Sequence, residues 1–101
     1  MNKKWYVKPS NIHGVGVFSL DTIFRGETID HGIYFLAYVI PLVTKFGSKI
    51  NHSFTPNTAL VYNGTKNTYD IVAIRHILPH TELTLDYRGT PFYIQKPEPH
   101  W

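Results

Sequence analysis

The chain has 101 residues, enough for one domain with a single hydrophobic core. Hydrophobic residues make up 43% of it and charged residues 17%, a composition that argues against disorder except at the ends. The absence of cysteine excludes disulfides and thiolate metal sites. The net charge of +3 predicts weak affinity for acidic surfaces, and because the ten Lys and Arg residues are spread along the chain, we expect no direct nucleic-acid binding.

The apolar segments are too short to cross a membrane. The longest one, residues 33–43, contains Pro41, and no apolar run follows the lysines near the N-terminus. We therefore expect no signal peptide and no membrane partner, and a soluble, intracellular protein. Because so small a domain buries a limited fraction of its surface, a homodimer would bury more.

Short β-strands are predicted along most of the chain. Glycine and proline recur at short intervals, and the segments between them are rich in Val, Ile, Tyr, Phe and Thr. In chain order, the predicted strands cover residues 5–8, 16–20, 27–35, 58–63, 68–76 and 83–87. Asn63-Gly64 predicts a tight hairpin turn, or the start of a longer loop that ends at Asn67.

A helix is predicted only in the middle of the chain. Residues 34–43 contain Pro41 and several β-branched and aromatic residues, so we expect a turn or two at most, near residues 37–46. The terminal segment, residues 91–101, should be extended because it contains three prolines. It also contains aromatic residues, and these predict that it packs back on the domain.

One candidate ligand-binding segment lies near the N-terminus. His13, Gly14, Val15 and Gly16 predict a tight loop in which glycine permits positive φ and a bare backbone can approach a ligand closely. A strand-like run follows this loop, whereas a dinucleotide-binding fingerprint needs a third glycine that opens a helix. A Rossmann-type site is therefore excluded.

Two further candidates lie in the middle and near the end of the chain. Residues 51–57 read Asn-His-Ser-Phe-Thr-Pro-Asn, and Asn51 and His52 could be a structural pair or could grip a polar cofactor. The residues alone favour the structural alternative. Tyr87 ends the last predicted strand, just before Arg88 and Gly89, and could belong to the core or line a site.

Other kinds of catalytic centre lack the residues they need. There is no cysteine nucleophile, no serine in a strand–turn–helix elbow and no phosphate-binding loop. Among the six histidines, only His76 and His80 have the spacing of a zinc-binding helix, and Pro79 interrupts that helix. We expect no metal site.

Taken together and in this order, the three segments resemble the SET-domain protein lysine methyltransferases. Residues 12–18, followed by Arg-Gly-Glu at 25–27, are similar to the family's first block. Residues 51–57 are similar to its Asn-His-Ser-x-x-Pro-Asn motif, and residues 73–77 with 82–87 to the block that ends in the catalytic tyrosine. The resemblance covers nearly the whole chain and identifies residues 1–101 as one minimal, free-standing SET domain of the viral or bacterial type.

The resemblance also implies a fold and a set of site residues. The fold is mostly β: a β-clip of small sheets with a C-terminal pseudoknot, which would bring Asn51 and His52 next to Tyr87. The implied cofactor is S-adenosylmethionine, and its implied binding residues are His13, Gly14, Val15, Gly16, Asn51, His52 and Phe92. Tyr87 is the implied catalytic residue, and Tyr34, Tyr62 and Tyr93 are candidates for the substrate channel.

The chain departs from the family pattern in a few places. The turn before the last block is His80-Thr81-Glu82 where the family has Gly-Glu-Glu, and we interpret this as a tolerable surface change. The arginine that often precedes the Asn-His motif is absent, and the insert at residues 30–46 is short. Because no cysteine-rich flanking modules are present, zinc is not expected.

The resemblance implies a protein-lysine N-methyltransferase that acts on a histone tail or another basic peptide, in the cytoplasm or in a host nucleus on chromatin. One alternative is a catalytically degenerate SET domain that binds a peptide or partner without turnover, and the intact Asn51, His52 and Tyr87 argue against it. The other alternative is a small basic β-barrel that binds nucleic acid. The scattered basic residues argue against that one.

Overall fold

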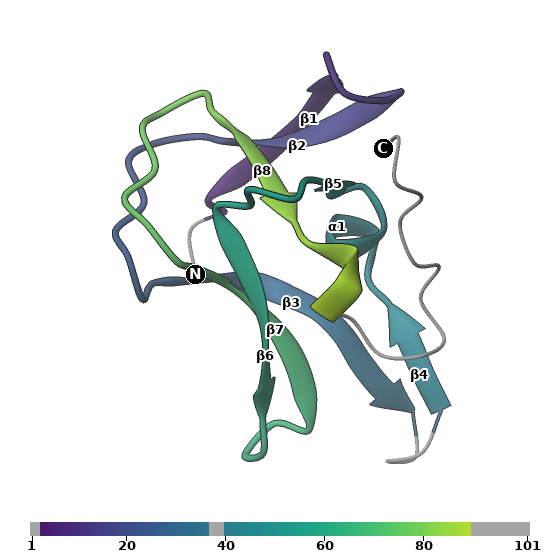
Figure 1. Ribbon diagram of the computed structural model, residues 1–101. Coiled ribbons are helices and arrows are strands. Elements are labelled where there is room, and N and C mark those ends of the chain that lie inside the picture. Colours follow the sequence, from purple (N-terminus) through teal and green to yellow (C-terminus); the bar gives the residue numbers. More distant parts are fainter. Residues whose placement is uncertain (1–2, 37–39, 90–101) are drawn as a thin grey trace.

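The computed structural model describes residues 3–36 and 40–89 (Figure 1). The strands in this part of the chain are β1 (Trp5–Pro9), β2 (Val15–Ser19), β3 (Thr28–Leu36), β4 (Ile40–Val43), β5 (Asn51–His52), β6 (Thr58–Asn63), β7 (Thr68–Ala73) and β8 (Glu82–Leu85). The helices are α1 (Lys45–Ser48) and the 3₁₀ helix η1 (Tyr87–Gly89). Among the described residues, no helix is long and apolar enough to cross a bilayer.

The strands form two small sheets. The first has the order β1-β2-β8-β5 and the second the order β4-β3-β7-β6. Neighbouring strands are antiparallel except β5 and β8, which pair in parallel with Asn51 opposite Thr84 and His52 opposite Leu85. The predicted class, mostly β with small sheets and short helical turns, is confirmed.

Most predicted strands are confirmed, and two are shorter than expected. The strands predicted at residues 5–8, 16–20, 27–35 and 58–63 agree with β1, β2, β3 and β6 within one residue at each end. The strand predicted at 68–76 ends at Ala73, and the one predicted at 83–87 ends at Leu85. The hairpin between β6 and β7 uses the longer loop, in which Asn67 has a φ of 54°.

The predicted helix is displaced. Residues 40–43, inside the expected helix, form β4 instead, where Pro41 lies opposite Phe35 of β3. A proline is tolerated there because β4 is an edge strand. The helix begins at Lys45, after Thr44 has capped it by accepting the Gly47 N–H at 2.9 Å. Residues 37–39 lie outside the described part of the chain.

The hydrophobic core draws side chains from both sheets and from α1. Its buried residues are Val17, Ile23, Ile29, Phe46, Ile50, Ile71, Ala73, Ile77, Leu83 and Leu85. Two of these, Ile23 and Ile77, lie on separate loops that two backbone hydrogen bonds of 2.9 and 2.8 Å join. Trp5 packs against Phe46 with 4.9 Å between ring centroids, so the first strand covers α1. Burial of this core fixes the position of the segment that precedes β5.

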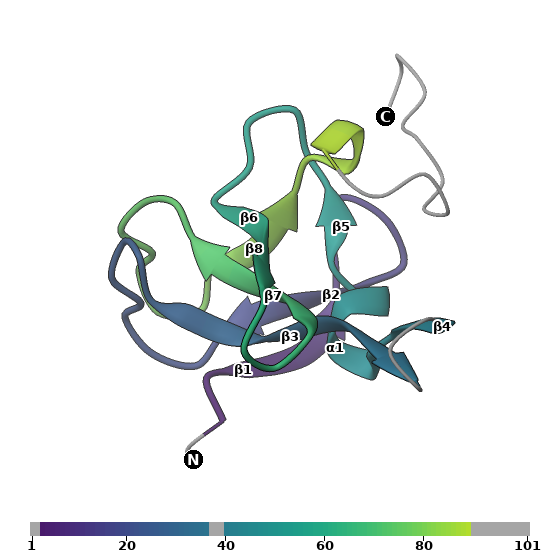
Figure 2. The same ribbon diagram turned by 90° about the horizontal axis from the view of Figure 1, so that it is seen from below.

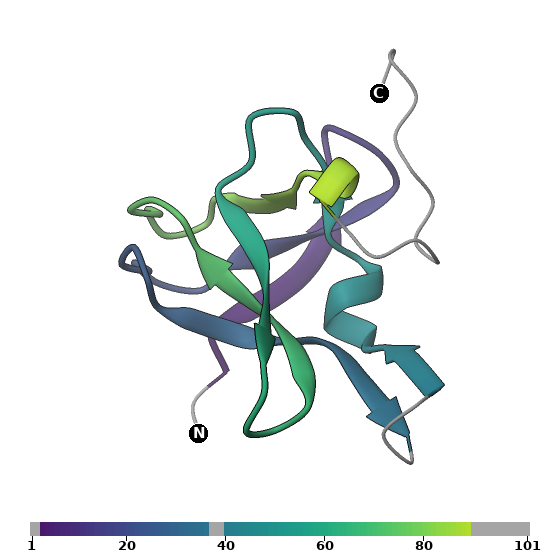
Figure 3. The same cartoon turned by 60° about the horizontal axis from the view of Figure 1, so that its bottom comes forward.

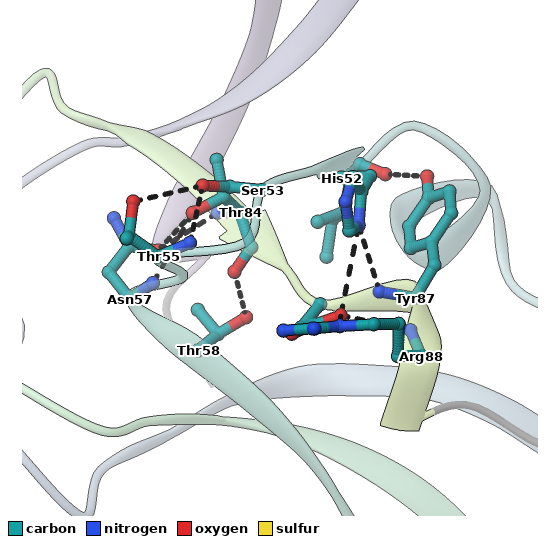
Figure 4. Close-up of polar contacts among 10 residues, drawn as sticks. His52, Ser53, Thr55, Asn57, Thr58, Thr84, Tyr87 and Arg88 are labelled. Carbon is teal, nitrogen blue, oxygen red and sulfur yellow. Dashed lines mark hydrogen bonds and ion pairs between the residues drawn. The ribbon is translucent and has the colours of Figure 1, made fainter. Parts of the chain in front are cut away.

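The arch between β5 and β6, residues 51–58, encloses β8 (Figure 2). Near its start, the Ser53 N–H donates to the Leu85 carbonyl at 3.1 Å. Near its end, the Asn57 side chain donates to the Glu82 carbonyl at 2.8 Å. It also accepts the Thr84 N–H at 2.8 Å (Figure 4). Asn57 therefore replaces a strand partner for β8. The strand β8 runs within an earlier loop, in agreement with the pseudoknot that the resemblance implies.

Replacing Asn57 with alanine should lower the free energy of unfolding by about 2–3 kcal/mol, because it leaves two backbone groups of β8 without these hydrogen bonds. Urea unfolding followed by circular dichroism measures the change. Asn11→Ala, at an exposed loop position, is the matched control and should stay within about 0.5 kcal/mol of the parent. Equal stability of the two variants would contradict the assigned role of Asn57.

Candidate active site

The helix η1 is fastened to β5 through Tyr87. The Tyr87 backbone N–H donates to Nδ1 of His52 at 3.0 Å, and the Tyr87 hydroxyl donates to the Ile50 carbonyl (Figure 4). Because a backbone N–H can only donate, Nδ1 of His52 carries a lone pair and the proton of the neutral ring is on Nε2. The structure thus brings His52 and Tyr87 into direct contact, with 5.3 Å between their ring centroids.

Asn51, the neighbour of His52 on β5, joins the N-terminal loop to β8. Its Nδ2 lies 3.1 Å from the His13 carbonyl and 3.2 Å from the Val15 carbonyl. The same nitrogen lies 3.1 Å from Oγ of Ser10 and 2.9 Å from Oε2 of Glu82. The predicted cofactor loop and the Asn-His motif are therefore neighbours, linked by one amide group.

Glycine is required at two positions of this loop, for a different physical reason at each. Gly14 has a φ of +48°, and a Cβ added there would meet nothing within 4 Å, so backbone conformation explains this glycine. Gly16 is buried, and a Cβ there would lie 2.3 Å from Oε2 of Glu82. The protein itself therefore needs Gly16. The loop remains open at His13 and Gly14, which are exposed, and at Val15, which is 45% exposed.

A charged pair lies on either side of Tyr87 in the chain, and the Phe54 ring packs between this pair and His52. Arg88 bonds to Asp86 with 2.6 Å between Nη2 and Oδ2, and its guanidinium lies 4.7 Å from the centroid of the Phe54 ring. Phe54 in turn packs edge-on against His52 at 4.3 Å. The hydrogen bond from Arg88 lowers the pKa of Asp86 from 3.8 to about 2, outweighing partial burial, which acts in the opposite direction.

The environment of Tyr87 keeps its hydroxyl neutral. Partial burial raises the pKa of this phenol above its ordinary value of 10.0. The hydroxyl therefore keeps its proton at neutral pH and donates it in the bond to the Ile50 carbonyl. Such a group can orient a bound partner through its oxygen lone pairs, but it is not a general base.

Two predicted channel residues lie away from this site. Tyr34 is 44% exposed on β3, between Leu42 and Thr68 of the neighbouring strands. Tyr62 is 53% exposed on β6, and its hydroxyl donates to Asn67 at 2.7 Å in the hairpin loop, which projects away from η1 (Figures 1 and 3). The hydrogen bonds and ring contacts of the described residues link neither tyrosine to Tyr87, so their channel role stays a prediction.

Two other predicted site residues, Phe92 and Tyr93, lie outside the described residues, as does the whole terminal segment 91–101. Among the residues that the structure does describe, no group of three or more His, Asp or Glu side chains could hold a metal ion.

Glu82 is a residue of this site that sequence reasoning missed. The departure from the family's turn falls on His80 and Thr81, and His80 is exposed, whereas Glu82 keeps the family's residue. The Glu82 carboxylate is partly buried and accepts hydrogen bonds from Ser10 and Asn51. These partners are 72 and 31 positions away in the sequence, so no local pattern could reveal them.

Comparison with known proteins places this geometry in a known fold. The model of the SET-domain family matches residues 38–88, which are 51 of the 101 residues and include Asn51, His52 and Tyr87. No curated protein sequence matches the chain. One similar solved structure is a candidate histone methyltransferase from Plasmodium falciparum, with a TM-score of 0.72, 24% sequence identity, and coverage of 93% of this chain and 100% of the other. That likeness establishes the fold and confirms the predicted β-clip.

The Asp86–Arg88 pair predicts a specific loss of stability in acid. Because the Asp86 pKa of about 2 in the folded protein is below 3.8, its stabilisation is fully present above about pH 3.8 and is lost as the pH falls through about 2. Between these values, the free energy of unfolding should fall more steeply in the parent than in Asp86→Asn.

Urea unfolding at a series of pH values measures this difference. Asp21→Asn, at an exposed carboxylate that takes part in no ion pair among the described residues, is the control and should follow the parent curve. Parallel curves for the parent and Asp86→Asn would show that the pair does not stabilise the fold.

Proposed function

This chain belongs to the SET-domain family, and we propose on that premise that it is an S-adenosylmethionine-dependent protein-lysine N-methyltransferase. Members of the family are generally lysine methyltransferases. The proposed substrate is a lysine in a histone tail or another basic peptide. The observation that carries the proposal is the contact of Tyr87 with His52, next to the loop that Asn51 holds.

The residues around this contact fit the proposed cofactor in their chemistry. Bound S-adenosylmethionine supplies an activated methyl group on a positively charged sulfur. The exposed backbone of His13, Gly14 and Val15 offers amide and carbonyl groups for its polar amino-acid end. Each hydrogen bond of the Asn51 side chain among the described residues uses Nδ2, which leaves Oδ1 to accept a bond from the ligand.

Gly16 and His52 would contribute to cofactor binding indirectly. Gly16 makes room for the Glu82 carboxylate beneath the loop. His52 is buried, and its Nδ1 is occupied by the Tyr87 N–H, so this side chain holds η1 in place. Both residues thus shape the site through their neighbours, whereas the loop backbone would touch the ligand.

The proposed reaction depends mainly on alignment. A methyl group passes in line to a neutral amine, and correct placement of two reactants can contribute about 7–11 kcal/mol. The lysine must first lose a proton, because its reference pKa is about 10.4, and a nearby positive charge with apolar surroundings lowers this value. The neutral Tyr87 hydroxyl directs its proton to the Ile50 carbonyl, so its oxygen can accept an N–H of the amine and orient the nitrogen lone pair.

Incubation of the purified chain with S-adenosylmethionine and a mixture of histones, followed by mass spectrometry, tests the proposal. Mass increases of one or more methyl groups on lysine are the expected result. Cofactor binding without any methylation would support the alternative of a peptide-binding SET domain instead. Sedimentation velocity on the same sample tests the proposed homodimer, which has twice the 11.7 kDa of one chain.

Tyr87→Phe should lower kcat by about a hundredfold or more, because it removes the hydroxyl that orients the amine, while cofactor affinity stays nearly unchanged. The variant also loses the bond to the Ile50 carbonyl, so circular dichroism must show that it is folded at the assay temperature. Tyr6→Phe is the matched control, because the Tyr6 hydroxyl bonds to His80, on a loop away from η1. Near-normal turnover in Tyr87→Phe would remove Tyr87 from this role.

A further inference from the structure

We propose that Glu82 is a positioning residue: its carboxylate sets the conformation of the loop at residues 10–16 and, through that loop, the affinity for the methyl donor. The inference rests on the proposed function for its cofactor part. Its structural part, the control of the loop by Glu82, stands on the hydrogen bonds of the described residues alone.

The Glu82 carboxylate lies at the centre of a small polar cluster. Oγ of Ser10 donates to it, at 2.8 Å from Oε1 and 2.9 Å from Oε2. Nδ2 of Asn51 donates to Oε2 at 2.9 Å. Glu82 forms no ion pair among the described residues, so its negative charge is stabilised by neutral donors. Hydrogen bonds to a charged group are stronger than neutral ones, so this cluster should be well ordered.

The carboxylate dictates the orientation of Asn51. An ionised carboxylate can only accept hydrogen bonds, so the amide must turn its NH₂ group toward Oε2. That same nitrogen then faces the carbonyls of His13 and Val15, which also only accept. If the amide were rotated by half a turn, its oxygen would face three acceptors. Glu82 thus acts with the two loop carbonyls to favour the orientation in which Asn51 can hold the loop.

The carboxylate orients Ser10 in the same way. A serine hydroxyl has a single proton, and here it goes to Glu82, which leaves the oxygen lone pairs for the loop. They accept the N–H of Ile12 at 2.9 Å and of His13 at 3.4 Å. The Ser10 N–H also closes the loop by donating to the Gly14 carbonyl at 2.8 Å. One carboxylate therefore orients both side chains that hold the loop, Ser10 and Asn51.

The absence of a side chain at Gly16 makes this arrangement possible. A Cβ at this position would lie 2.3 Å from Oε2 and 2.9 Å from Cδ of Glu82, closer than real contacts allow. Gly16 lies in β2, which pairs with β8 through Phe18 and Glu82. The second glycine of the loop and the first residue of β8 therefore fit each other, and together they connect the proposed cofactor loop to the strand that leads to Tyr87.

A series of substitutions at Glu82 tests the inference by calorimetric titration with S-adenosylhomocysteine, the demethylated cofactor. Glu82→Leu keeps most of the volume but removes both acceptors, and should raise Kd by about tenfold or more. Glu82→Gln keeps one acceptor oxygen and should be intermediate. In turnover assays, the KM for the cofactor should rise while kcat at saturation changes little. Glu27→Gln, which loses the ion pair with Lys4, is the matched control and should bind as the parent does.

A second measurement does not depend on the cofactor. Amide hydrogen exchange at Ser10, whose N–H closes the loop, should accelerate in Glu82→Leu and, to a smaller extent, in Glu82→Gln. If Glu82→Leu fails to fold, the Gln variant decides the question by the same two measurements. Unchanged exchange at Ser10 would overturn the structural part of the inference.

The two measurements also separate this inference from the proposed function. If the parent chain binds no S-adenosylhomocysteine and methylates nothing, the proposed function fails, and exchange at Ser10 alone decides whether Glu82 controls the loop. If the parent binds and the variants bind equally well, the positioning role is overturned while the proposed function stands. A fall in kcat with an unchanged KM would also contradict it, since Glu82 would then affect the chemical step.

Discussion

The hydrogen bond from the Tyr87 N–H to the His52 imidazole is the interaction on which the rest of the site depends. It joins residues 35 positions apart, next to the point where β5 and β8 pair in parallel. The hydroxyl of the same tyrosine adds a second link, to the Ile50 carbonyl. Residues 50–52 therefore hold both the backbone N–H and the hydroxyl of Tyr87, which leaves the ring little freedom to move.

Side-chain amides and a carboxylate do much of the work that backbone pairing does in larger sheets. Asn57 supplies both a donor and an acceptor to β8, and Asn51 bridges two loop carbonyls to Glu82. A domain of this size has a small core, so ordered polar links of this kind can decide where short segments lie. The residue types of the Asn-His motif thus serve the fold and the proposed site at once.

The chemistry proposed for the site relies on the same few polar groups. A neutral tyrosine hydroxyl, a backbone loop and an amide cannot remove a proton efficiently, but they can hold two reactants in line. Methyl transfer to an amine needs alignment more than it needs a strong base. A scaffold that fixes Tyr87 and the loop at residues 10–16 against the same pair of strands provides such alignment.

The sequence by itself determined six of the eight described strands, because enrichment in Val, Ile, Tyr, Phe and Thr between turn residues is a local property. It also determined the three motif segments, but it did not reveal β4 or the two-residue strand β5. It did not determine that Pro41 lies in an edge strand and that the helix starts only at Lys45, since β4 exists because β3 is beside it. Only the tertiary structure decided the role of Glu82 and the meeting of His52 with Tyr87. Those contacts join residues far apart in the chain, which lie together because the arch at residues 51–58 encloses β8.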